Sequence, residues 1–198
     1  MNNKILNDLI KIFSKLPSLG PRSARRVVLH LLNNKENLML PLLSIMEDGY
    51  NSIKKCKTCG NLTTEDICEI CSDSTRNKEI LCIVENVADL WAIESTMNYK
   101  GQYHILGGNL SASEGRGPND IDIDGVLKRL KSDLAIKEVI IATNPTIEGQ
   151  TTSFYILDLL KDMNVKITKP AYGIPLGSEF NYLDESTLDI AFKNKKEF

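Results

Sequence analysis

The chain has 198 residues, 42% of them hydrophobic, and a formal net charge of −2. This is enough apolar material for one large folded domain or two smaller ones. The apolar runs are only a few residues long and residues 1–8 contain no apolar signal core, so we expect no membrane span and no secretory leader, and we place the protein in the cytoplasm.

The charge is unevenly distributed along the chain. Residues 1–32 carry six Lys or Arg against a single acid, whereas residues 81–198 carry twelve basic and seventeen acidic residues. A basic N-terminal part on an acidic body indicates that any contact with nucleic acid begins at the N-terminal part. The alternative is a solvated helix face that binds nothing.

Three helices are predicted before residue 54. Apolar residues recur at helical spacing over 5–16 and again over 24–32, where Arg22, Arg26 and His30 lie four residues apart on a separate face. Pro41 opens a third helix. We expect this helix to point its apolar residues inward: Leu42, Ile45, Met46 and Ile53. Residues 1–54 then form a small helical head.

A short turn, Leu16-Pro-Ser-Leu-Gly20, joins the first two helices. We expect Gly20 to adopt positive φ and the N–H groups of Leu19 and Gly20 to lack partners, so that they bind a phosphate at the start of the second helix. The predicted DNA-binding residues are Ser18, Leu19, Gly20, Arg22, Arg25 and Arg26. Such contacts are independent of base sequence and sensitive to salt. The alternative is an ordinary corner between helices, where Gly and Pro serve geometry alone.

Two Cys-x-x-Cys pairs, Cys56/Cys59 and Cys68/Cys71, lie within residues 55–78. Four thiolates that converge on one point form the tetrahedral cage that zinc favours, and no further ligand lies nearby, so a closed structural site is predicted. Two structural disulfides, or a redox-active pair, are the alternatives. The fifth cysteine, Cys82, lies in an apolar run and is interpreted as a buried small side chain.

Residues 79–169 alternate short apolar strands with helices. The strands are expected at 80–84, 103–106, 138–143 and 165–168, and the helices at 87–97, 123–134 and 151–163. This alternation predicts a parallel sheet, and therefore a multi-domain α/β protein. Two connections, 107–120 and 170–181, are long enough to suggest a functional role.

Acidic side chains follow two of the predicted strands. Glu85 and Asp89 come after the first strand, and Glu148 follows the strand at 138–143. In a parallel sheet both positions lie at the carboxyl edge, where ligands bind. A structural alternative is that Glu85 and Glu148 merely cap the helices that follow the strands.

The turn at 16–20 and the residues after it, Pro21-Arg-Ser-Ala-Arg-Arg26, resemble the helix-hairpin-helix motif of DNA-repair proteins. The order of hairpin, four-cysteine finger and α/β domain is similar to the RecR family of bacterial recombination mediators. Residues 170–198 resemble the last block of that family, which is described there as a Walker-B-like assembly segment, although Pro170 and Asn181 depart from its pattern. The chain contains no P-loop, so ATP hydrolysis is not expected.

The α/β part resembles the Toprim domain of topoisomerases and primases. In the catalytic members, a Glu assists proton transfer and an Asp-x-Asp-x-Glu set holds magnesium. Here Asn144 and Thr146 stand at the two Asp positions. Because this exchange removes two negative charges that magnesium requires, we expect no enzyme, and an acidic edge that holds a partner protein or a weakly bound ion. A magnesium-dependent Toprim nuclease or primase is the competing hypothesis.

The resemblance to the RecR family implies a DNA-binding component of recombinational repair. It implies one structural Zn²⁺ per chain, sequence-independent binding of single- and double-stranded DNA, and assembly into a ring-shaped homotetramer or dimer. It also implies action with RecO or RecF in loading RecA onto single-stranded DNA. A third hypothesis is a scaffold that binds proteins and not DNA.

Overall fold

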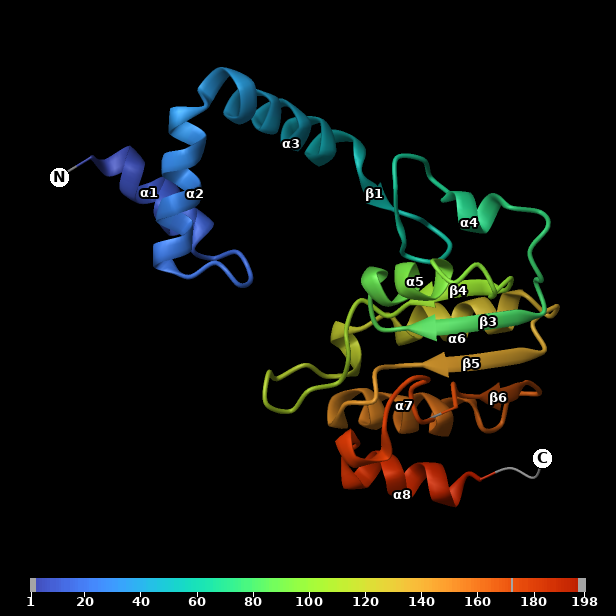
Figure 1. Cartoon of the computed structure of the whole chain (residues 1–198). Coiled ribbons are helices and arrows are strands. Elements are labelled where there is room, and N and C mark those ends of the chain that lie inside the picture. The colour runs from blue at the N-terminus through green and yellow to red at the C-terminus, as the bar shows by residue number, and fades with distance from the viewer. Residues whose placement is uncertain (1–2, 172, 196–198) are drawn as a thin grey trace. The chain divides into compact units, whose positions relative to one another are not determined.

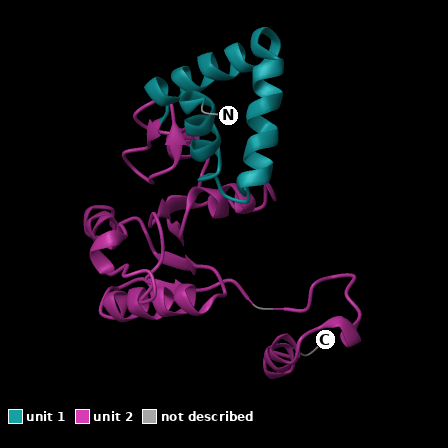
Figure 2. Cartoon of the chain, turned by 90° about the vertical axis from the view of Figure 1, so that its left-hand side faces the viewer, with its two compact units in different colours: residues 1–53 teal, residues 54–198 magenta. Residues whose placement is uncertain are grey.

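The computed structural model describes residues 3–171 and 173–195. The chain divides into two compact units, residues 1–53 and residues 54–198, which Figure 2 shows in separate colours. Each unit is described by itself below.

The first unit consists of helices (Figure 1). Its elements are α1 (Lys4–Phe13), α2 (Pro21–Asn33), a π-helical turn (Lys35–Met39) and α3 (Leu40–Ser52). Asn3 begins α1, because its side-chain oxygen accepts a hydrogen bond from the Leu6 N–H at 3.2 Å. The buried residues of α2 are Ala24, Val28 and Leu31, which lie on one stripe of the helix. The predicted helical head is confirmed.

Helix α3 differs from the prediction. Ile45 is 64% exposed, Met46 62% and Ile53 52%, and only Leu42 of the four residues expected to point inward is half-buried. The helix runs away from the α1–α2 pair (Figure 1), and no residue of α3 is buried. Only its first part reaches that pair, where Leu42, Leu43 and Met46 line an apolar hollow with residues of α1 and α2. The expectation that Ile45 and Ile53 point inward is therefore wrong for a single chain, and Met46 lines the hollow but stays largely exposed.

The second unit begins with a small cysteine-containing segment. Strands β1 (Lys54–Lys55) and β2 (Leu62–Thr63) pair antiparallel, and the short helix α4 (Glu69–Ser72) follows. The four-stranded sheet comes next, with strand order β4-β3-β5-β6 and every pair parallel. Its strands are β3 (Ile80–Val84), β4 (Gln102–Ile105), β5 (Glu138–Ala142) and β6 (Lys166–Thr168). The predicted parallel α/β fold is confirmed.

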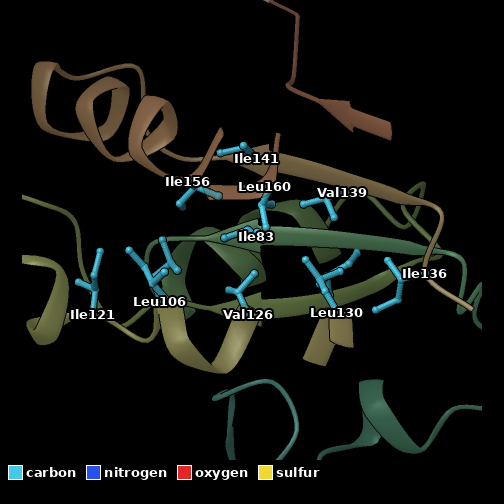
Figure 3. Close-up of a cluster of buried hydrophobic side chains, with 12 residues drawn as sticks. Ile83, Leu106, Ile121, Val126, Leu130, Ile136, Val139, Ile141, Ile156 and Leu160 are labelled. Atoms are coloured by element: carbon cyan, nitrogen blue, oxygen red, sulfur yellow. The ribbon is translucent and has the colours of Figure 1, made fainter. Parts of the chain in front are cut away.

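Helices connect the strands: α5 (Val87–Glu94), α6 (Ile123–Ser132) and α7 (Ile147–Leu160). Helix α7 begins four residues before the predicted start, because the hydroxyl of Thr146 accepts the Gly149 N–H at 3.1 Å and caps the helix there. Two apolar clusters lie on the two faces of the sheet. The larger one joins Ile83, Val126 and Ile156 (Figure 3), and the smaller one joins Cys82, Leu90 and Tyr103.

The chain ends with a 3₁₀ turn (Phe180–Tyr182) and α8 (Glu185–Lys193), which Asp184 caps. Helix α8 has no buried residue within the part of the chain that the structure describes. Across the same residues, no helix combines the length and the apolar character that crossing a membrane requires.

Candidate nucleic-acid interface and metal centre

The hairpin between α1 and α2 has a left-handed residue, but it is not the glycine. Ser18 has φ of +63°, whereas Gly20 has φ of −72° and ψ of 170°, an extended conformation open to any residue. The expectation of positive φ at Gly20 is therefore wrong. The polypeptide reverses at Ser18, and Gly20 is the residue that immediately precedes α2.

The backbone N–H groups of this turn are only partly free. The Leu19 N–H donates to the Leu16 carbonyl at 3.1 Å, so the prediction that it lacks a partner is wrong. Among the residues that the structure describes, no hydrogen bond engages the N–H of Gly20 or of Arg22, and α2 has no side-chain cap. Free N–H groups at the start of a 13-residue helix present a positive electrostatic end to solvent.

Three arginines follow the turn on the first two turns of α2. Arg22, Arg25 and Arg26 are exposed. Within residues 3–171 and 173–195, no carboxylate forms an ion pair with any of them, so their guanidinium groups are available to an anion from outside the unit. Nothing lies within 4 Å of the place where a side chain on Gly20 would begin, so another molecule can approach this backbone.

The four predicted metal ligands converge on one point. The sulfur atoms of Cys56, Cys59, Cys68 and Cys71 all lie within 4.8 Å of one another, and the Cys59 and Cys68 sulfurs are 3.6 Å apart. All four are free thiols, and three of them are buried while Cys71 is half-buried. Two tight turns place the sulfurs. The Gly60 N–H donates to the Cys56 carbonyl at 3.0 Å, with φ of +81° at Gly60, and the Ser72 N–H donates to the Cys68 carbonyl at 3.0 Å.

Backbone donors point at these sulfurs, as a thiolate cage requires. The Asn61 N–H lies 3.4 Å from the Cys59 sulfur and the Cys68 N–H lies 3.3 Å from the Cys56 sulfur. A hydrogen bond shared with Cys71 lowers the pKa of Cys59 to about 6, and the same bond raises the pKa of Cys71. One thiol therefore ionises readily within a set of four of which three are buried, and four cysteine sulfurs are a donor set that zinc prefers.

The predicted acidic residues at the sheet edge are engaged by protein groups. Glu85 is only 3% exposed. Its Oε1 accepts the Asn144 N–H at 2.7 Å, and its Oε2 accepts the side-chain amide of Asn109 at 2.9 Å. A buried carboxylate with both oxygens bonded to N–H donors is stabilised without a cation.

Asp89 and Glu148 take separate places. Asp89 forms a capping box with Asn86 at the start of α5 and lies 3.4 Å from the Asn144 side-chain amide. Burial makes the charged form of Asp89 less favourable and therefore raises its pKa. Glu148 is half-buried in the first turn of α7. Across the residues described, only the four cysteines bring three or more metal-ligating side chains to one point.

The segments match known family models in the same order. Residues 6–48 match the RecR helix-hairpin-helix, 53–73 the RecR four-cysteine zinc finger, 79–171 a Toprim domain and 173–196 the RecR C-terminal segment. The protein from Ehrlichia canis called recombination protein RecR is 48% identical over 190 residues, which are 96% of this chain and 97% of that one. The chain belongs to the RecR family.

Two further relatives with the same name support the assignment. The protein from Neorickettsia sennetsu is 47% identical and covers 98% of each chain, and the one from Rhodopseudomonas palustris is 46% identical over 96% of this chain and 94% of its own. The RecR zinc-finger model spans all four cysteines. Together with the sulfur geometry, this shows that the cysteines hold one structural zinc in this RecR chain.

Sequence reasoning missed two residues at the Toprim edge of this RecR family member. Asn109 binds Glu85 and is held in turn by Arg116, whose Nε donates to the Asn109 carbonyl at 3.1 Å and whose Nη2 donates to the Asn109 side-chain oxygen at 2.5 Å. The only available signal was the length of the loop at 107–120. No spacing pattern identifies an amide that meets a carboxylate 24 residues away.

Proposed function

We propose that this protein is a non-enzymatic DNA-binding component of recombinational repair that holds the sugar-phosphate backbone with its helical head. The observation that carries the proposal is the group of three unpaired arginines beside the free N–H groups at the start of α2. Both features favour a phosphate and neither reads a base edge. The head therefore binds single- and double-stranded DNA without regard to sequence.

Reversal of charge tests the interface. The double variant Arg22→Glu/Arg26→Glu is expected to abolish binding of labelled single- and double-stranded oligonucleotides, measured by fluorescence anisotropy over a salt titration. The matched control, Lys4→Glu/Lys11→Glu, changes the net charge of the same unit equally on exposed positions of α1. Affinity that stays unchanged in the arginine variant at low salt, or that falls equally in both variants, would contradict the interface.

Self-association suits the head for this task. Large apolar side chains of α3 are exposed, among them Ile45, Met46 and Tyr50, which is 88% exposed. Exposed apolar groups of this kind support burial against another copy. We infer a homotetramer or dimer with a ring shape, in which several weak backbone contacts act together and gain avidity. Light scattering with and without DNA measures the assembly, and a monomer at micromolar concentration in both states would exclude it.

The Toprim edge supports docking of a partner protein in place of catalysis. We infer that RecO or RecF binds there while the complex loads RecA onto single-stranded DNA, since Glu85 already has two N–H partners and the Asp positions hold Asn144 and Thr146. Asp89 and Glu148 complete the predicted edge. Pull-down of RecO and of RecF with the variant Glu148→Lys tests this role, and undiminished binding of both would contradict it.

A further inference from the structure

Strand β4 forms one edge of the sheet, so one side of it has no neighbouring strand. Backbone groups of alternate residues point to opposite sides of a strand. The Leu106 N–H, just after β4, donates inward to the Val84 carbonyl at 2.9 Å, whereas the Ile105 N–H points outward. That outward N–H donates to the carbonyl of Cys59 at 2.8 Å. A metal-ligating residue thus supplies the partner that a further strand would otherwise supply.

The next outward group of β4 is covered as well. The Tyr103 carbonyl accepts a hydrogen bond from Nη1 of Arg129 at 2.7 Å, and the same Nη1 lies 3.4 Å from the carbonyl of Thr58. The other guanidinium nitrogen donates to the side chain of Gln102. Arg129 therefore connects the backbone between two metal ligands to the edge of the sheet.

The segment between the ligands fits closely on β4. A side chain on Gly60 would begin 3.4 Å from the Cβ of Ile105, and positive φ already restricts this position. Ile70, between the ligands Cys68 and Cys71, packs both against the buried cysteines and against the cluster that contains Tyr103 and Ile105. The metal-bearing segment is thus bonded directly to the sheet at the Ile105 N–H, linked to it a second time through Arg129, and packed against one of its faces.

We propose that the cysteine segment, residues 56–71, is the cover of the sheet's free edge, and that bound metal keeps this cover in place. Apart from the metal, this segment and the residues that flank it are held together by the two-residue strands β1 and β2, a one-turn helix and the exposed ion pairs of Lys54 and Lys57 with Asp66, too little structure to persist alone. Its release would free the Ile105 N–H, which donates outward from β4. An uncovered strand edge pairs with other extended chains. Two copies of this protein would each expose the same β4 edge and could pair there.

Metal removal from the full-length protein tests the cover. Amide hydrogen exchange is followed at single residues before and after treatment with a chelator, with released metal counted by a colorimetric dye. The Ile105 amide is expected to exchange at least ~10-fold faster after removal, while the inward amides of His104 and Leu106 stay protected. Unchanged exchange at Ile105, or equal loss of protection throughout the sheet, would overturn the proposal.

The variant Arg129→Ala tests whether the cover protects Ile105 independently of metal binding. Arg129→Ala in metal-loaded protein is expected to keep one zinc per chain and to speed exchange at Ile105 by several-fold, because the bond to Tyr103 and the link to Thr58 are lost. Lys128→Ala, on the exposed side of the same helix, is the matched control and is expected to change neither quantity. Equal exchange in the two variants would show that Arg129 does not hold the cover and would contradict its role.

Discussion

Glu85 accepts a hydrogen bond from the backbone N–H of Asn144, 59 residues later in the chain, at 2.7 Å. This bond joins the end of β3 to the end of β5 at the carboxyl edge of the sheet. The side-chain amide of Asn109 donates a hydrogen bond to the second carboxylate oxygen of Glu85. A residue type that serves proton transfer in the Toprim enzymes is therefore an internal hydrogen-bond acceptor in this chain.

Both carboxylate oxygens of Glu85 already accept hydrogen bonds, so we predict that the protein does not respond to magnesium. Incubation with DNA and Mg²⁺ or Mn²⁺ is expected to give no cleavage, and millimolar Mg²⁺ is expected to leave the melting temperature unchanged, because a ligand that binds the folded state would raise it. Gel electrophoresis and calorimetry measure the two effects. Cleavage that disappears in Glu85→Gln would establish the competing nuclease or primase hypothesis.

Gly149 in the first turn of α7 must remain a glycine. A side chain there would begin 2.1 Å from the Asn144 carbonyl oxygen and 2.6 Å from Glu85 Oε1. We expect Gly149→Ala to lower the free energy of unfolding by about 1–3 kcal/mol, measured by urea denaturation, since backbone must move to admit the methyl group. Gly49→Ala in α3 is the control, because its nearest neighbour would be Ile53 at 3.7 Å, an ordinary contact. Equal stability of the two variants would contradict the close approach.

The sheet and its edge show how far sequence reasoning extends. The apolar strand at 80–84 and the alternation of strands and helices predicted the parallel order, because a two-sided buried sheet leaves that pattern in the sequence. The cysteine spacing predicted the metal site for a similar reason. Partners of Glu85 could not be predicted, since Asn109 and Asn144 approach it only after the loop and the sheet have folded. The exposure of Ile45 on α3 was missed because periodicity identifies an apolar face without telling whether the same chain covers it.

His104 makes the stability of the second unit sensitive to acid. Burial lowers its pKa below the usual 6.5, although the nearby Asp122 opposes this effect, and Arg129 adds to it. Below pH 6.5 the unfolded chain therefore binds a proton that folded His104 resists, so stability is present above that pH and is lost as the pH falls. His104→Gln is expected to reduce this loss between about pH 6.5 and 5 in urea denaturation. His30→Gln, at an exposed position, is the control, and identical pH profiles for both variants would contradict the prediction.

Gly20 distinguishes a DNA-binding turn from an ordinary corner between helices. Its φ of −72° is open to every residue and no atom lies within 4 Å of an added Cβ, so the fold of the single chain does not require glycine there. We expect Gly20→Ala to change the free energy of unfolding by less than ~0.5 kcal/mol, as surface substitutions do. The same methyl group lies beside the free N–H groups at the start of α2 and obstructs a phosphate that approaches them, so affinity for DNA is expected to fall about tenfold, as the loss of one charge-assisted hydrogen bond would produce. Anisotropy and urea denaturation on the same preparation give both values. If neither the affinity for DNA nor the free energy of unfolding changes, the prediction is contradicted and the turn is an ordinary corner between helices.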